Sequence, residues 1–351
     1  MLSRYLCKYT GKQESYLPKL DDNFPNNSLK IAFGILSSKE SEQAIDDIAG
    51  AVFPHPVYVH HDFSKQPNFS PIAPNIHILQ QPVVTAWGDF SLVEASFLLM
   101  KEALKDINVT HFQLLSESCL PVRPIHEFED YLSKEHPDVM IDMYSLENED
   151  AMFSHGWRYL QHRYFFNKLL EKACWWASGR RIAAYRTTCS INLRIPLQDS
   201  IKDQILEAVG KRVVHLFFKS TNKMLAKDNL QQIAIGGQWF GASRRGVNWL
   251  LNMRNHCDTF TQHYQRCTIP DESYLHTFVY NGQLAGLPLR VYPSNHLVSW
   301  MDCKTGPDTL KEQDIERTLD SEKFFSRKFS LSTDDYTRRY FIRVLLKNNP
   351  S

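Results

Sequence analysis

The stretch KIAFGIL, residues 30–36, decides how the first half of the chain folds. A short apolar run of this kind is typical of a strand that is buried within a sheet. It ends at Ser37, and Glu40 follows three residues later, a spacing that predicts a capping box and the start of a helix. Three apolar residues of that helix would face the core: Ala44, Ile45 and Ile48. The stretch therefore predicts a buried strand followed by a helix.

The same strand-and-helix unit recurs further along the chain. More strands are expected at residues 56–60, 76–79, 111–115 and 139–143. A second capping box, Ser91 with Glu94, opens an amphipathic helix whose apolar positions recur at offsets of three and four. This alternation predicts an α/β fold with a doubly wound, mostly parallel sheet flanked by helices. Ligands of such sheets bind at the carboxyl ends of the strands, which places Ser37, Asp62 and Ser116 near one crevice.

The second half of the chain has a less regular pattern. A strand kinked by a glycine pair is expected at residues 233–242, and a helix at residues 271–279. Aromatic and basic side chains gather between residues 157 and 181, and residues 332–347 predict a closing basic helix. One side of that helix would carry Tyr336, Tyr340 and Val344.

The composition excludes several classes of protein. Of 351 residues, 40 are Lys or Arg and 39 are Asp or Glu, which leaves a net charge of +1. A protein that binds duplex nucleic acid needs a strongly basic face, so no nucleic-acid partner is expected. The seven cysteines are scattered and none forms a C-x-x-C pair, which predicts reduced thiols rather than a zinc ribbon or a redox motif.

The absence of long apolar segments bears on location. No stretch approaches the roughly 18 apolar residues of a membrane-spanning helix, and the first residues lack the apolar core of a signal peptide. The sequence therefore predicts a cytoplasmic protein. The aromatic and basic segment and the closing helix are candidates for peripheral contact with an anionic inner membrane. In the alternative interpretation, their aromatic side chains line the core or an acceptor site.

Several familiar motifs are missing. The chain has no P-loop, no G-x-G-x-x-G after its first strand, no G-x-S-x-G and no H-E-x-x-H. It also has no Asp-x-Asp, the carboxylate pair that normally holds a divalent metal on a sugar-nucleotide diphosphate. The acidic triplets at residues 127–129 and 147–149 are more typical of solvated surface than of a metal site. We therefore expect no metal cofactor.

Candidate donor-binding residues follow the second strand and precede the second helix. Asp62 could accept hydrogen bonds from a ribose or a base, or it could stabilise a turn. Trp87 and Gly88 precede the predicted helix, and Gly88 permits a close backbone approach to a ligand. His60 and His61 would point to opposite faces of a strand, which makes them poor joint metal ligands.

Candidate acceptor-binding residues lie in the second half. Gln238 and Trp239 follow the glycine pair, and a tryptophan beside an amide is typical of a sugar site, with a core tryptophan as the alternative. Trp157 and Arg158 begin the aromatic and basic segment and are assigned to the same acceptor side.

Charged pairs at two later positions could carry the chemistry. Asp271 and Glu272 lie at the start of a predicted helix, where one could cap the helix and the other could act as a general base. Arg327 and Lys328 lie within the aromatic run FFSRKF. Such cations suit a phosphate ligand, and the alternative is a surface strand with solvated bases.

Seven segments, in order, resemble the core-2/I-branching glycosyltransferase family, which includes the peptide O-xylosyltransferases. They are the first strand with Ser37-Ser38, VYVHHD (57–62), AWGDFS (86–91), LLSESCLP (114–121), GGQWF (236–240), IPDESY (269–274) and FFSRKF (324–329). The segments near the C-terminus are most similar to bacterial members. The similarity runs from about Lys30 to Phe329.

The resemblance implies a GT-A-like fold and an inverting, metal-independent transfer from a UDP-sugar to a glycan hydroxyl. The sugar would be GlcNAc or xylose in a β linkage, and the acceptor a glycan or a lipid-linked glycan. Glu272 matches the family's catalytic base, and Lys328 matches the lysine that takes over the metal's role on the diphosphate. Ser37 and Asp62 match positions near the uridine.

The chain departs from the family at the diphosphate. Animal members carry an arginine there, and the corresponding stretch of this chain contains His296. A histidine would weaken the phosphate clamp or make it dependent on pH near 6.5, and Arg327 could compensate. The acceptor-side strand of the family matches Gln238 and Trp239.

We expect a lead-in at residues 1–28, a single GT-A-like domain at residues 29–330 and a basic helix at residues 331–351. Residues 29–145 would form the nucleotide-binding half, and residues 146–330 an irregular half that binds the acceptor and the diphosphate. The predicted function is bacterial surface polysaccharide or glycoconjugate synthesis by sugar transfer. The alternatives are a protein that binds a nucleotide or glycan without turnover, and a sugar-nucleotide hydrolase.

Overall fold

A computed structural model describes most of the chain. It covers residues 29–146, 219, 222–267, 269–299 and 306–347. Trp157 and Arg158, with the rest of the aromatic and basic segment, lie outside the described residues.

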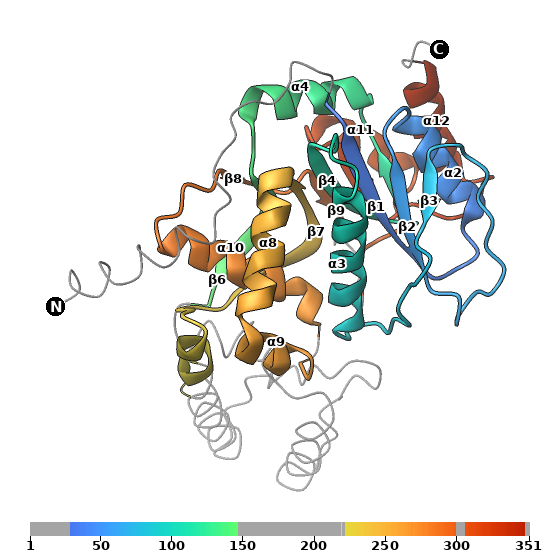
Figure 1. The fold of residues 1–351 in the computed structure, drawn as a ribbon. Helices are drawn as coiled ribbons and strands as arrows, with labels where there is room; N and C mark the ends of the chain where they lie inside the picture. Colours follow the sequence, from blue (N-terminus) through green and yellow to red (C-terminus); the bar gives the residue numbers. More distant parts are fainter. Residues whose placement is uncertain (1–28, 147–218, 220–221, 268, 300–305, 348–351) are drawn as a thin grey trace, which may run out of the picture.

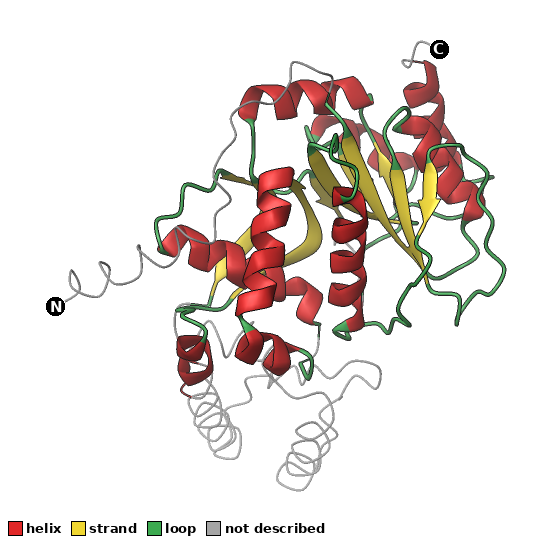
Figure 2. Ribbon diagram, viewed as in Figure 1, coloured by secondary structure: helices red, strands yellow, loops and turns green. Residues whose placement is uncertain are grey.

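A seven-stranded sheet forms the centre of the described part (Figure 2). In spatial order its strands are β3 (Ile76–Ile78), β2 (Val57–His61), β1 (Ile31–Ser37), β4 (His111–Ser116), β7 (Ala234–Ser243), β6 (Val139–Ser145) and β8 (Val291–Tyr292). Among these strands β7 is antiparallel to both of its neighbours, and the other six run in one direction. The predicted α/β fold with a mostly parallel sheet is confirmed, and it is consistent with a GT-A-like fold.

β1 contains the stretch that opened the sequence analysis. Every residue of β1 except Leu36 is buried, and the strand pairs in parallel with β2 and β4. At Gly34 a Cβ atom would lie 2.5 Å from the ring of Phe112, so a glycine leaves room for that ring on the neighbouring strand. The prediction of a strand buried inside a sheet is therefore confirmed.

Helices cover the sheet. α3 (Ser91–Leu104) and α8 (Arg244–His256) lie side by side against its centre, and α10 (Tyr274–Leu284) packs on β6 and β7 (Figure 1). Further α-helices of the described residues are α2 (Glu42–Ala51), α4 (Ile125–Glu135), α9 (Asp258–Tyr264), α11 (Ile315–Asp320) and α12 (Tyr336–Lys347), and residues 222–227 are also helical. Two 3₁₀ helices are η4 (Pro270–Glu272) and η5 (Glu312–Asp314). In α2 the three predicted core residues are buried as expected.

Both predicted capping boxes are wrong. α2 begins only after Ser41, because Ser37 still belongs to β1. In α3 the carboxylate of Glu94 forms an ion pair with Arg254 of α8 instead of reaching back to the helix start. Neither helix therefore begins with a side-chain cap.

A second, three-stranded sheet lies beside the carboxyl end of β4. It contains β5 (Cys119–Pro121), β10 (Phe325–Arg327) and β9 (His296–Val298), in that order. β10 is antiparallel to β5 and parallel to β9. This small sheet brings Arg327 and His296 beside β5, although they lie about two hundred residues further along the chain.

The closing helix, α12, buries one of its faces against the rest of the fold. It begins at Tyr336, and its described buried residues are Thr337, Arg338, Phe341 and Leu345. The side chain of Arg338 is fully buried, forms an ion pair with Asp47 at 3.0 Å and donates to the backbone oxygen of Ala44 at 2.8 Å. One basic residue of this helix therefore binds it to α2 and is not exposed to solvent.

Two further observations bear on the predictions of location and thiol state. Among the described helices, none combines the length and the apolar character needed to cross a bilayer. Cys119, Cys257 and Cys267 are free, buried thiols, and the other four cysteines lie outside the described residues.

Candidate active site

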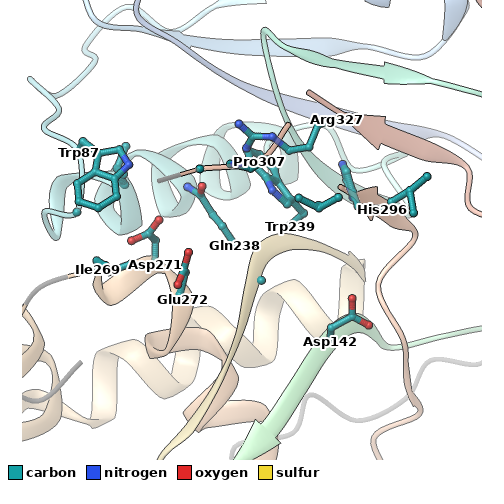
Figure 3. A pocket seen from close by; sticks show the side chains of 16 residues that line it. Trp87, Asp142, Gln238, Trp239, Ile269, Asp271, Glu272, His296, Pro307 and Arg327 are labelled. Atoms are coloured by element: carbon teal, nitrogen blue, oxygen red, sulfur yellow. The ribbon is translucent and has the colours of Figure 1, made fainter. Parts of the chain in front are cut away.

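A cavity of about 520 Å³ is lined by both sheets, by η4 and by the start of α3 (Figure 3). Seven predicted site residues line it: Trp87, Gly88, Gln238, Trp239, Glu272, His296 and Arg327. Ser37, Asp62 and Lys328 are not among its lining residues. The cavity therefore joins most of the predicted catalytic, donor and acceptor residues in one place.

Two carboxyl groups enter the cavity from η4, the short turn before α10. Asp271 and Glu272 both line it, and neither caps α10, so the prediction that one of them would do so is wrong. The next residue, Ser273, donates from its hydroxyl to the backbone oxygen of Ala234 in β7 at 2.9 Å and shares a 2.7 Å hydrogen bond with the Tyr264 hydroxyl. These contacts hold the turn, and with it both acids, against β7.

The turn that carries the acids is also linked to the segment that carries Trp87. The backbone N–H of Ile269 donates to the oxygen of Gly88 at 2.9 Å. Both residues have a left-handed backbone, with φ of +51° at Ile269 and +66° at Gly88. This conformation suits glycine but strains a β-branched residue. The strain at Ile269 is retained where the chain turns into the two acids.

Arg327 supplies a cation at another wall of the cavity. Its guanidinium lies over the ring of Trp239, 4.3 Å from the ring centre, and its Nε has no hydrogen-bond partner among the described residues. Burial lowers the pKa of Arg327, while Cys119 and Glu117 act in the opposite direction. Arginine remains charged under such a shift, so a desolvated cation is available for an anionic group.

Trp239 and Trp87 differ in what they offer a ligand. Trp239 is 6% exposed, with Arg327 over its ring and the His296 ring centre 5.6 Å away. The structure thus favours the alternative of a core tryptophan at this position. Trp87 is 58% exposed at the cavity, so it is the tryptophan whose face is open to a sugar.

His296 is neutral in this environment. Burial first, and then the charges of Arg327 and Lys323, lower the pKa of His296 to about 3. Neither ring nitrogen has a hydrogen-bond partner among the described residues. The expectation that His296 titrates near pH 6.5 as part of a phosphate clamp is corrected: at neutral pH it is an uncharged group of the cavity wall, and Arg327 is the cation.

Lys328 lies next to the cavity rather than in its wall. Its backbone oxygen accepts from the N–H of Leu310 at 2.8 Å, and its own N–H donates to Asp308 at 3.4 Å. Its ammonium group forms no hydrogen bond or ion pair with the residues that the structure describes. The assignment of Lys328 to the diphosphate stays a prediction.

Both carboxylate oxygens of Asp62 accept hydrogen bonds from neighbouring residues of the protein. Its two carboxylate oxygens accept from the backbone and hydroxyl of Ser64, at 3.1 and 2.6 Å, and from the backbone and hydroxyl of Thr85, both at 2.8 Å. The Lys65 ammonium lies 3.3 Å away. Burial would raise the pKa of Asp62, but these hydrogen bonds hold it well below its usual range. Asp62 therefore ties the end of β2 to the segment that precedes Trp87.

Ser37 also has local partners. Its hydroxyl is hydrogen-bonded to His61 at 2.9 Å and to Ser41 at 3.1 Å, and its backbone oxygen accepts from the N–H of Asp62 at 3.0 Å. The predicted clustering of Ser37 and Asp62 at the strand ends is confirmed, whereas their contact with uridine stays a prediction.

Sequence reasoning missed one carboxylate of the cavity. Asp142 of β6 lines it, and its Oδ1 accepts from the backbone N–H of Ser294 at 2.9 Å. The sequence signal that could have found it is an acidic residue inside an otherwise apolar strand. In the structure, the pairing of β6 with β7 is irregular at this point. Among the described residues, no group of three or more His, Cys, Asp or Glu side chains is placed to hold a metal ion.

Within an α/β fold, a carboxylate and a desolvated cation line one cavity, an arrangement that suits a group-transfer enzyme. A sequence model of the Core-2/I-Branching enzyme family matches residues 31–194 and 199–323, so the chain belongs to this family. The predicted family is thereby confirmed, and with it, at the level of the family, the prediction of a glycosyltransferase.

Two curated relatives agree with this assignment. Xylosyltransferase sqv-6 of Caenorhabditis elegans is 20% identical over 359 residues, which cover 94% of this chain and 38% of the relative. Xylosyltransferase sqv-6 of Caenorhabditis briggsae is 20% identical over 348 residues, with 91% and 37% covered. The chain thus spans less than two fifths of the length of these relatives.

Proposed function

We propose that the protein transfers a sugar from a UDP-sugar to a glycan hydroxyl with inversion and without a divalent metal. One observation carries the proposal: Glu272 and Arg327 line the same cavity on different elements, η4 and β10. A base and a cation at two walls of one cavity suit a single displacement at an anomeric carbon.

In the proposed reaction, Glu272 takes the proton of the acceptor hydroxyl while the oxygen of that hydroxyl attacks the anomeric carbon of the donor sugar. The bond from that carbon to the diphosphate oxygen breaks, and UDP leaves with the electron pair. In this proposal Arg327 stabilises the charge that develops on the diphosphate, and Lys328 adjoins it in sequence. A preorganised cation of this kind stabilises the transition state by roughly several kcal/mol.

The relatives and the family name guide the choice of donor. UDP-xylose is the first candidate, because both curated relatives are named xylosyltransferases, and UDP-GlcNAc is the second. Glycan or lipid-linked glycan acceptors, in bacterial surface polysaccharide or glycoconjugate synthesis, are proposed from the sequence resemblance. A panel of UDP-sugars in a thermal-shift assay would identify the donor, because a true ligand stabilises the fold by mass action.

Replacement of the base tests the proposal. In Glu272→Gln we expect kcat to fall by about 100-fold or more, as for other general bases, while the Kd of UDP stays within about two-fold of wild type. Glu312→Gln, at an exposed glutamate of η5, is the control and should retain full activity. Wild-type turnover in Glu272→Gln would refute the role of Glu272.

Two assays separate the alternatives. A binding protein would bind UDP-sugar and release no UDP, a hydrolase would release UDP rapidly without acceptor, and a transferase would release it rapidly only with acceptor. Activity that is abolished by EDTA and restored by Mn²⁺ would refute the metal-independent mechanism.

A further inference from the structure

A second carboxyl of the cavity has an oxygen that the protein leaves unsatisfied. Oδ1 of Asp271 is fully buried and has no hydrogen-bond partner among the described residues. Asp271 lines the cavity, so its carboxyl borders the space that a bound molecule would occupy. A buried polar atom without a partner is unfavourable, and a ligand group that hydrogen-bonds to it removes that penalty.

The charges around Asp271 determine what kind of group it can bind. Burial first, and then the neighbouring Glu272, raise the pKa of Asp271 to about 7. The other ionisable groups that line the cavity are Asp142, the neutral His296 and Arg327, whose guanidinium is stacked on Trp239. Near neutral pH the Asp271 carboxyl is partly protonated, so it can both donate and accept a hydrogen bond. A hydroxyl group is the matching partner.

The neighbours of Asp271 favour a sugar. Figure 3 shows its carboxyl between the ring of Trp87 and the carboxyl of Glu272, with the side chain of Gln238 extending toward it. Trp87 presents an exposed aromatic face, against which the C–H face of a sugar ring packs well. A ring held there would present one hydroxyl to Asp271 and an adjacent hydroxyl to Glu272.

We propose that Asp271 is a specificity-determining residue that binds a hydroxyl of the acceptor sugar next to the hydroxyl on which Glu272 acts. The inference rests on the proposed function and narrows it. The acceptor is a sugar ring with two neighbouring hydroxyls, and a peptide serine, which offers a single hydroxyl, is excluded.

The first test is an acceptor panel. UDP release from UDP-xylose and UDP-GlcNAc is measured with the methyl glycosides of xylose, glucose, galactose and mannose, and with a serine-containing peptide. The monodeoxy forms of the best glycoside are then compared in wild type and in Asp271→Leu. For wild type, we expect one monodeoxy form to have a KM on the order of ten-fold higher than its parent, as for the loss of one buried hydrogen bond.

Asp271→Leu should lose the same hydrogen bond by removing its protein partner. In Asp271→Leu the KM of the parent glycoside should rise on the order of ten-fold, and the monodeoxy form should bind no worse than its parent. The Kd of UDP should stay within about two-fold. Asp130→Leu, at an exposed aspartate of α4, is the matched control.

A second variant keeps the inference testable if leucine disrupts the fold. Asp271→Asn keeps the shape of the side chain but cannot titrate. The KM of the glycoside should change around pH 7 in wild type and should not in Asp271→Asn. A purely structural role for Asp271 would leave that pH dependence in place.

Several outcomes would overturn the inference. The first is a KM of the parent glycoside that is unchanged in Asp271→Leu, and the second is a higher KM of the monodeoxy form that persists in that variant. The third is the same pH dependence of KM in Asp271→Asn as in wild type, and the fourth is transfer to the peptide with none to any glycoside. In each of these the wild type still binds UDP and releases it from a UDP-sugar. If wild type does neither, the proposed function itself is wrong.

Discussion

Arg327 is held in the cavity wall by its contact with an aromatic ring. The guanidinium is flat and lies over the Trp239 ring at 4.3 Å, so its position is set by stacking as well as by charge. A lysine keeps the charge but cannot stack as a plane or present a fork of donors.

Replacement of Arg327 by lysine should therefore weaken nucleotide binding. We expect the Kd of UDP to rise about ten-fold in Arg327→Lys, measured by isothermal titration calorimetry, because the pre-positioned fork of donors is lost. Arg339→Lys, at an exposed position of α12, should bind UDP as wild type does. An unchanged Kd in Arg327→Lys would show that this side chain does not hold the diphosphate.

At the same scale, the sequence predicted which residues meet at the cavity better than it predicted their contacts and charges. Asp62 was recognised as a polar residue at the end of a strand, but its partner Thr85 lies 23 residues away, beyond any local pattern. His296 was expected to titrate near neutral pH. Its pKa depends on burial against Phe325 and Trp239, which only the fold brings together.

Among the elements, the link between Gly88 and Ile269 joins the segment of Trp87 to the turn of the acids. Both residues have positive φ, and one backbone hydrogen bond connects them. In Gly88→Ala a Cβ would have space, with its nearest neighbour at 3.5 Å, but the left-handed backbone remains strained. We expect the free energy of unfolding to fall by about 1–2 kcal/mol, and kcat to fall with it.

Urea unfolding and steady-state kinetics measure the two effects. Gly50→Ala is the control, because a Cβ at Gly50 in α2 meets no atom within 4 Å and the backbone is helical. There alanine should stabilise the protein by up to about 1 kcal/mol. A Gly88→Ala protein as stable and active as wild type would show that the link does not position Glu272.

α12 makes a second prediction at this scale. Arg338 is fully buried and pairs with Asp47 of α2, so its replacement leaves a largely buried carboxylate without its cation. We expect Arg338→Met to lower the free energy of unfolding by about 3 kcal/mol, measured with urea. Arg339→Met, at an exposed neighbour, should change it by less than about 0.5 kcal/mol. Equal effects at the two positions would contradict the fastening role of Arg338.

Helices and strands with a clear apolar sequence pattern were predictable, and elements without one were not. Buried strands such as β1 and β4, and the amphipathic core face of α2, follow from local apolar patterns. The small sheet did not, because strands of three residues such as β9 and β10 have no period to read. The capping boxes failed for a related reason: Glu94 pairs with a residue 160 positions away, a contact that no local spacing reveals.

For the molecule as a whole, three buried histidines should make stability dependent on pH. Burial lowers the pKa of His111 and His276 to about 4 and that of His296 to about 3. Below their unfolded value of about 6.5 the unfolded chain binds protons that the folded chain does not, so stability falls with pH. Asp271 acts in the opposite direction, because its raised pKa favours folding as pH falls from about 7 towards 4.

The expected net effect of these four groups is a loss of stability between pH 6.5 and pH 4. Each histidine contributes about 1.4 kcal/mol per pH unit in this window, and Asp271 offsets one of them. Urea unfolding at pH 7.5 and pH 5.5 would measure it, and the loss should be larger in Asp271→Asn. Equal stability at the two pH values would contradict the neutral, buried state of the histidines.

The position of β7 has a consequence for how the protein is made. β7 lies between β4 and β6, yet the chain passes through residues 146–233 before it reaches β7. On the ribosome, β4 and β6 therefore emerge first. β4 then has one unpaired edge, and β6 has two, because β7 and β8 both follow it in the chain. Open strand edges invite pairing with other chains. A nascent or truncated chain that ends before residue 234 should depend on chaperones, and full-length synthesis should relieve that dependence.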